Sequence, residues 1–165
     1  MGMSVTISVA TEQDVEQIFR LQYLCFQSEA ALYGNYRIDP LVQSLDSVRA
    51  EVASDCVFVA RLGDEVIGSV RGRITEDGAA SIGKLCVHPR LQGHGIGARL
   101  LRAAESALAE ERGAKKFRLF TGHRSEGNLR LYRRVGYETV GTSKGDDGVP
   151  MIILEKPAGT YATTA

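Results

Sequence analysis

The stretch Val87–Ala98, which reads VHPRLQGHGIGA, decides the fold. It follows an apolar, strand-like segment and contains a proline at position 89. Glycines stand at positions 93, 95 and 97, where an amphipathic helical pattern begins. Glycines here mean either that the chain turns sharply or that a ligand comes very close to the backbone. The first N–H groups of a helix have no partner inside it, and the helix dipole makes that end an anion site. The stretch is therefore a candidate phosphate-binding loop.

The composition limits the class of protein. The 165 residues are 44% hydrophobic and carry 20 basic against 20 acidic side chains, which suits one globular domain and argues against a nucleic-acid partner. No apolar run approaches the ~20 residues of a membrane span, and no secretory signal opens the chain. Cys25, Cys56 and Cys86 form no metal or disulfide pattern and are expected to be buried free thiols. We expect a cytoplasmic single domain over residues 1–157, with residues 158–165 as a disordered tail.

The hydrophobic periodicity around the loop predicts a mixed architecture. Strands are expected at 3–10, 56–62, 66–74, 79–87, 116–121, 137–142 and 149–155, and helices at 11–26, 40–52, 95–112 and 125–135. Thr11 with Asp14 resembles a capping box before the first helix. In the third strand, Val66 and Gly68 are predicted to share one face, with Arg71 and Arg73 on the opposite face, which either meets an acidic substrate or, more usually, is simply solvated. The order is β-α-α-β-β-β-α-β-α-β-β, an α/β (α+β) fold with helices on both faces of one sheet.

Gly93-x-Gly95-x-x-Ala98 satisfies the dinucleotide fingerprint, but its surroundings oppose that interpretation. A Rossmann loop follows its strand almost at once and is expected to have an acidic residue after the next strand. Here Pro89 and further residues intervene, and Gly122-His123-Arg124 follows the next strand. An oxidoreductase that binds NAD is disfavoured.

Two motifs resemble one family. Val87-x-Pro89-x-x-Gln92-Gly93-x-Gly95-Ile96-Gly97 resembles the acyl-CoA-binding motif of the GNAT superfamily of N-acetyltransferases. Ser125-x-x-Asn128-x-x-Leu131-Tyr132-x-x-x-Gly136-Tyr137 resembles the late helix of that family. The element order agrees across essentially the whole chain. The resemblance implies a GNAT-like, mostly antiparallel sheet and an acetyl-CoA-dependent N-acyltransferase.

The resemblance also implies a set of cofactor-binding residues. The pyrophosphate of acetyl-CoA would lie on the backbone N–H groups of the loop, and the pantetheine arm would pair with the strand edge just before it. Either Ser125 or Asn128 would contact the pantetheine, although Ser125 is equally suited to cap the following helix. The implied cofactor-binding residues are Leu85, Cys86, Val87, Gln92, Gly93, His94, Gly95, Ile96, Gly97, Ala98, Ser125 and Asn128.

Tyr132 is the predicted catalytic residue. By this resemblance a primary amine attacks the thioester directly in a ternary complex, and the phenol donates a proton to the departing CoA thiolate. The alternative for Tyr132 is an ordinary core aromatic beside Leu131. A backbone N–H near Leu85 or Val87 would stabilise the oxyanion. Cys86 as an acetyl carrier is less suited than a small buried thiol, and no metal ligand set is expected.

The general base and the acceptor stay open. Several family members carry a glutamate on the strand before the loop, but residues 79–84 read AASIGK. Ser81 through a water, Glu29, Glu76 or His123 are candidates, as is an acceptor that arrives neutral. The acceptor, a small molecule or a protein amine, is expected near Phe26, Glu29, Tyr33, Tyr36 and His123. The alternative function is a catalytically silent GNAT-fold module that binds acyl-CoA as a regulatory ligand. Dimerisation is common in the family, so a homodimer is compatible with the resemblance.

Overall fold

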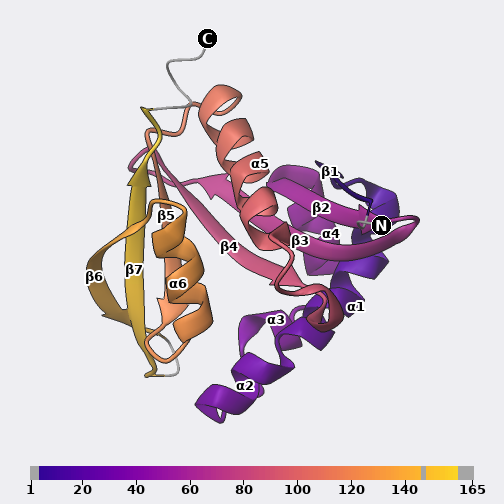
Figure 1. Cartoon of the computed structure of the whole chain (residues 1–165), viewed down its shortest axis with the longest axis horizontal. Coiled ribbons are helices and arrows are strands. Elements are labelled where there is room, and N and C mark those ends of the chain that lie inside the picture. The colour runs from indigo at the N-terminus through magenta and orange to yellow at the C-terminus, as the bar shows by residue number, and fades with distance from the viewer. Residues whose placement is uncertain (1–3, 146–147, 160–165) are drawn as a thin grey trace. The chain divides into compact units, whose positions relative to one another are not determined.

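The computed structural model describes residues 4–145 and 148–159. The strands are β1 (Val5–Val9), β2 (Cys56–Leu62), β3 (Glu65–Ile74), β4 (Ala79–Val87), β5 (Lys116–Gly122), β6 (Glu138–Lys144) and β7 (Pro150–Pro157). The helices are η1 (Glu12–Asp14), α1 (Val15–Cys25), α2 (Gln27–Tyr33), α3 (Asp39–Val42), α4 (Leu45–Ser54), η2 (Pro89–Leu91), α5 (Ile96–Glu110) and α6 (Glu126–Arg134). The strands form one sheet in the order β1-β2-β3-β4-β5-β7-β6 (Figure 1). The predicted mixed α/β fold class is confirmed.

The backbone contacts divide the chain into two units, residues 1–72 with 84–104 and residues 73–83 with 105–165. The first unit contains β1, β2, most of β3, the helices α1–α4 and the glycine loop. The second contains β5, α6, β6 and β7 together with the beginning of β4. The expectation of a single domain over residues 1–157 stays a prediction.

A one-residue bulge in β3 reverses the alternation of its side chains. Arg61 pairs with Val66, whereas the adjacent Ala60 pairs with Gly68, and an extra residue moves later side chains to the other face. Val66 therefore packs into the cluster beside α1, whereas a Cβ on Gly68 would lie 2.9 Å from Leu100 of α5. The prediction that Val66 and Gly68 share a face is wrong for this reason.

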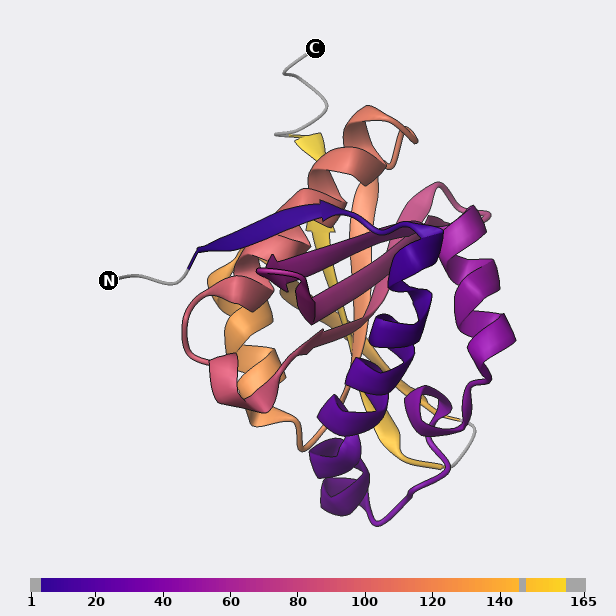
Figure 2. The ribbon, with the colours of Figure 1, turned by 90° about the vertical axis from the view of Figure 1, so that its right-hand side faces the viewer.

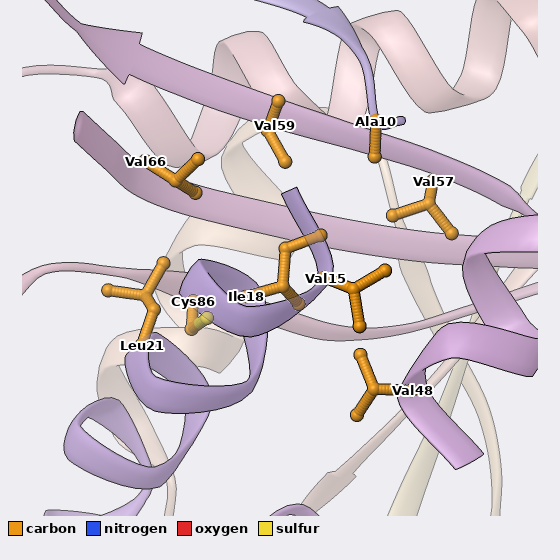
Figure 3. Close-up of a cluster of buried hydrophobic side chains, with 9 residues drawn as sticks. All are labelled: Ala10, Val15, Ile18, Leu21, Val48, Val57, Val59, Val66 and Cys86. Carbon is orange, nitrogen blue, oxygen red and sulfur yellow. The ribbon is translucent and has the colours of Figure 1, made fainter. Parts of the chain in front are cut away.

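Apolar residues of α1, α4, β2 and β3 form the core of the first unit. Val15 and Ile18, on the predicted face of α1, are 1% and 0% exposed, and Figure 2 shows α1 running beside α4. Burying a side chain of this size stabilises the fold by roughly 1.5–3 kcal/mol. Figure 3 shows the cluster, which consists of Ala10, Val15, Ile18, Leu21, Val48, Val57, Val59, Val66 and Cys86.

The predicted capping box is present, at the start of the short helix η1 that leads into α1. The Asp14 carboxylate accepts a hydrogen bond from the Thr11 backbone N–H at 2.8 Å. It also accepts two from the Arg61 guanidinium, at 2.7 and 2.6 Å. Burial raises the pKa of Asp14, but the hydrogen bonds from Arg61 and Thr11 outweigh it and hold that pKa below its usual value.

The predicted helix through Leu41 and Val52 is two helices, so this prediction is wrong. Leu41 lies in α3 and Val52 in α4, and Gln43 between them is extended, with ψ 134°. Ser44 is the cause, because its side chain accepts a hydrogen bond from the Ser47 N–H at 3.1 Å and so begins a new helix.

The second unit is built on β5. It pairs in parallel with Ala79–Ile82 of β4 and antiparallel with β7, and β7 forms a hairpin with β6. Phe117 and Leu154 are both 0% exposed at the centre of these strands. Ala158, at the start of the expected tail, is buried, and its N–H donates to the Lys115 carbonyl oxygen at 3.1 Å. Residues 160–165 of that tail lie outside the described residues.

Candidate functional site

The glycine loop joins β4 to α5 through η2. Gly93 and Gly95 have φ of +84° and +77°, a region that other residues rarely adopt, so both positions need glycine in order to turn. A Cβ at either position would meet no atom within 4 Å. The loop is therefore a sharp turn whose glycines also face open space, which suits both interpretations drawn from the sequence.

The start of α5 presents backbone donors. Gly95 precedes the helix, and its carbonyl accepts from the Arg99 N–H at 3.2 Å. The N–H groups of Ile96, Gly97 and Ala98 in the first turn therefore have no acceptor inside the helix. Together with the dipole of this 15-residue helix they can bind an anion. His94 is exposed in the turn just before them.

At the end of β4, one edge of the strand pairs with β3 and the other edge faces away from it. The His88 N–H donates to the Ile67 carbonyl of β3 at 2.8 Å, and alternation directs the polar groups of Val87 to the other edge. The Val87 carbonyl there accepts from Gln92 Nε2 at 3.2 Å and from Cys25 Sγ at 3.4 Å. Gln92 thus fixes the loop to its own strand. The pairing of a pantetheine arm with Leu85–Val87 stays a prediction.

β4 bends at Lys84, directly after its ladder with β5 ends at Ile82. Lys84 has φ +49°, an uncommon backbone conformation for a residue other than glycine. Its Nζ lies 2.7 Å from Asp39 Oδ2 and 3.3 Å from Glu51 Oε2, and it donates to Gln43 Oε1 at 2.9 Å. These partners from α3, α4 and the link between them hold the bend in place.

Arg71 is 4% exposed, so the predicted solvated position on β3 is wrong. Its Nε lies 2.7 Å from Glu51 Oε1, and its Nη2 donates to Gln22 Oε1 at 2.6 Å. Burial lowers the pKa of Arg71, and the charge of Glu51 opposes that shift. The β3 bulge explains the error, because it turns Arg71 toward α1 and α4. Sequence reasoning also missed Lys84 and Glu51, which carry no local signal of their pairing.

In the second unit, α6 carries three of the predicted residues on one face. Ser125 at its N-cap, Asn128 and Tyr132 are spaced three and four residues apart. Ser125 is 8% exposed, and Asn128 Nδ2 donates to Thr121 Oγ1 of β5 at 3.3 Å. The sequence therefore predicted a group of residues that does occupy one side of a helix.

Tyr132 is 6% exposed and packs against a second tyrosine. The rings of Tyr132 and Tyr137 lie 6.2 Å apart at 60°, and the Tyr137 N–H donates to the Tyr132 carbonyl at 2.9 Å. The Tyr137 hydroxyl donates to Glu105 Oε2 at 2.7 Å, and Lys156 Nζ donates to Glu105 Oε1 at 2.9 Å. Glu105 is 2% exposed, so a buried, charge-paired group anchors the ring that contacts Tyr132.

His123 follows β5, and Pro150 of β7 fixes its ring. His123 Nδ1 lies 3.2 Å from the Pro150 carbonyl oxygen. A carbonyl only accepts, so Nδ1 carries the proton in this hydrogen bond and a neutral ring keeps its lone pair on Nε2. That tautomer suits a proton acceptor.

The candidates for the acceptor side lie in and around α2. Phe26 immediately precedes α2, and Glu29 and Tyr33 follow at three and seven positions, the spacing of one helical face. All three are partly exposed. Tyr36, beyond the left-handed Gly34 that ends the helix, is 58% exposed. The structure thus places Phe26, Glu29 and Tyr33 on one side of a helix, whereas Tyr36 lies in the turn that follows it.

The mixed sheet and the glycine loop before α5 are those of the N-acetyltransferase fold. The sequence profile of the Acetyltransferase (GNAT) family matches residues 15–137, and the chain belongs to this family. A comparison with curated proteins finds no match. In the part of the chain that the structure describes, no helix is long and apolar enough to cross a membrane.

Solved structures share the fold at low sequence identity. PaiA N-acetyltransferase from Thermoplasma acidophilum, in complex with coenzyme A, is 19% identical, with 94% of this chain and 99% of that chain covered and a TM-score of 0.77. The ribosomal-protein-S18-alanine N-acetyltransferase from Escherichia coli is 17% identical, with 94% of each chain covered and a TM-score of 0.74. YncA from Salmonella typhimurium, with its cofactor acetyl-CoA, is 17% identical, with 94% of each chain covered and a TM-score of 0.75.

The family assignment confirms the predicted class of cofactor. GNAT acetyltransferases are acyl-CoA-dependent transferases that use acetyl-CoA. The chain has the features such a donor needs in its first unit, a helix N-terminus and a loop with open space at two glycines. The residues at the start of α5 therefore fit a pyrophosphate.

Proposed function

We propose that this protein transfers an acetyl group from acetyl-CoA to a primary amine by direct attack in a ternary complex. The observation that carries the proposal is the loop before α5, where left-handed Gly93 and Gly95 leave open space beside the helix N-terminus. The acceptor would be a small molecule or a protein amine in the cytoplasm. The fold neighbour that acetylates the alanine of ribosomal protein S18 is one example of a protein acceptor.

The first unit would bind the donor. Backbone N–H groups from Gln92 to Ala98 would hold the pyrophosphate, and the edge of Leu85–Val87 that faces away from β3 would hold the pantetheine. Acetyl-CoA supplies an activated thioester, whose acetyl group passes to the amine. A backbone N–H of Leu85 or Val87 would stabilise the charge that develops on the carbonyl oxygen.

The second unit would supply the acid. A tyrosine with an ordinary pKa near 10 keeps its proton at neutral pH and can donate it from Oη to the departing sulfur. Ser125 and Asn128, on the same face of α6 as Tyr132, are the candidates for a contact with the pantetheine. Tyr137 would keep the Tyr132 ring in position through their contact.

His123 is the best supported candidate for the base. Its Nδ1 lies 3.2 Å from the Pro150 carbonyl oxygen, a contact that orients the ring, and an imidazole is a common general base. Glu29 on α2, Glu76 and Ser81 through a water remain alternatives. Replacing His123 by Ala should lower kcat if its ring is the base, and should leave kcat near the wild-type value if it is not.

Thermal melting with acetyl-CoA, CoA and NAD in parallel tests donor binding. A ligand at 100 times its dissociation constant stabilises the folded protein by about 2.7 kcal/mol, which is roughly 5–11 °C for a chain of this size. A shift with acetyl-CoA and CoA but none with NAD is expected. No shift with saturating acetyl-CoA would refute the assignment of the loop.

Turnover with a panel of amines then separates an enzyme from the silent binding module. The wild type should release CoA steadily with at least one amine. Tyr132→Phe should lower kcat by roughly 10²–10⁴-fold, typical of general acid catalysis, and keep the melting shift with CoA. Binding without turnover in the wild type would favour the silent module. A Tyr132→Phe variant with wild-type kcat would remove Tyr132 as the acid.

A further inference from the structure

Two of the three cysteines, which are 61 positions apart in the sequence, meet in the first unit. Cys25 is the last residue of α1, and Cys86 lies near the end of β4. Cys25 Sγ donates to the carbonyl oxygen of Val87, the residue next to Cys86, at 3.4 Å. Cys25 therefore reaches from α1 to the end of β4 that carries Cys86. Both border the same buried cluster, where Figure 3 shows Cys86 beside Leu21 and Ile18.

The two sulfurs have different environments. Cys25 is partly exposed, whereas Cys86 is 7% exposed. The neighbouring Cys86 thiol lowers the pKa of Cys25. The neighbouring Cys25 thiol and burial raise the pKa of Cys86. Cys25 is therefore the thiol that a small oxidant reaches and that ionises first, and Cys86 is placed to react with it next.

We propose that Cys25 and Cys86 are a site of reversible oxidation, which hydrogen peroxide converts into a disulfide between α1 and β4. In the first step the Cys25 thiolate attacks a peroxide oxygen, the O–O bond breaks, and Cys25 becomes a sulfenic acid as hydroxide leaves. In the second step Cys86 loses its proton and attacks the Cys25 sulfur, the S–O bond breaks, and water leaves. The sum is two thiols and one hydrogen peroxide to one disulfide and two waters.

The position of Cys25 at the end of a helix allows the disulfide with Cys86 to form. It is the last residue of α1, and Phe26 after it has left the helical conformation, with φ −90° and ψ 6°. Helix ends adjust at lower cost than helix interiors. Oxidation also removes the thiol hydrogen that Cys25 donates to Val87, so the bond changes the strand end that leads into the glycine loop. A dithiol reductant returns both groups by thiol–disulfide exchange.

Peptide mapping of the native, full-length protein tests the proposal. The protein is treated with hydrogen peroxide, the remaining thiols are alkylated, and trypsin is added without reductant. Trypsin releases Cys25 in residues 21–37, Cys86 in residues 85–90 and Cys56 in residues 50–61. A linked pair of 21–37 and 85–90, lighter by two hydrogens and lost on treatment with dithiothreitol, is the expected result.

Two variants and a control sharpen the outcome. Cys56→Ala should keep the linked pair. Cys25→Ser should leave Cys86 as a thiol, and Cys86→Ser should let Cys25 proceed to sulfinic acid. Sulfinic acid at Cys25 in the wild type without the linked pair would overturn the proposal, and so would links that involve Cys56 equally. Acetyl-CoA takes part in neither step, so this result is independent of the proposed function.

Discussion

The hydrogen bond from Tyr137 to Glu105 allows a test of whether Glu105 anchors the ring that packs against Tyr132. The 2.7 Å bond reaches a carboxylate that is 2% exposed. Tyr137→Phe keeps the ring that contacts Tyr132 and removes only the hydroxyl. A hydrogen bond to a charged group contributes about 1.5–3 kcal/mol. We therefore expect the free energy of unfolding to fall by about 2 kcal/mol and the melting temperature by roughly 4–8 °C.

Urea unfolding and thermal melting measure the loss of stability in Tyr137→Phe, and the turnover rate shows whether the substitution also impairs catalysis at Tyr132. Tyr23, which is 56% exposed, supplies the matched control. Tyr23→Phe should change stability by no more than about 0.5 kcal/mol. Tyr137→Phe should keep kcat near the wild-type value, whereas Tyr137→Ala should lower it because the ring contact with Tyr132 is lost. A Tyr137→Phe variant as stable as Tyr23→Phe would refute the anchoring role of Glu105.

Two further outcomes follow from packing and charge. Gly68→Ala places a Cβ 2.9 Å from Leu100 and should destabilise by about 1–3 kcal/mol in urea unfolding, whereas Gly83→Ala, whose Cβ meets nothing within 4 Å, should not. The pKa of Asp14 is lowered in the folded protein. The stability that Asp14 contributes is therefore fully present above its pKa in the unfolded state, and it is lost as the pH falls through its pKa in the folded state. The stability difference between wild type and Asp14→Asn should therefore shrink in urea unfolding below about pH 4, and a difference that does not vary with pH would contradict the pairing with Arg61.

The parts of the fold that the sequence predicted are those set by local physics. The strand predicted at 56–62 and the capping box at Thr11 depend on residues within a few positions of one another. The start of α5 likewise follows from Gly93 and Gly95, whose positive φ is a local requirement. Such features produce a pattern within a short segment of sequence, so they can be predicted from the sequence alone.

The errors have non-local causes. The β3 bulge arises from how β3 pairs with β2, and it reversed the predicted environments of Val66 and Arg71. The candidate site shows the same limit. Its glycine loop was found from spacing, whereas Lys84 with Glu51, and Cys25 with Cys86, meet only through folding. No window of sequence contains both members of either pair.

Lys84 shows how such a non-local set can hold a strained backbone. A left-handed conformation costs a residue with a Cβ roughly 1–2 kcal/mol, and here the contacts of Nζ with Asp39, Gln43 and Glu51 oppose that cost. Two variants separate the backbone strain at Lys84 from the contacts of its Nζ. Lys84→Ala and Lys84→Gly both remove the contacts, but only glycine also removes the strain. Alanine is ordinarily the more stable of the two inside a strand, by about 0.5–1 kcal/mol, so at Lys84 the order should reverse in urea unfolding. If Lys84→Ala is the more stable variant, the backbone at residue 84 is unstrained and this reasoning is refuted.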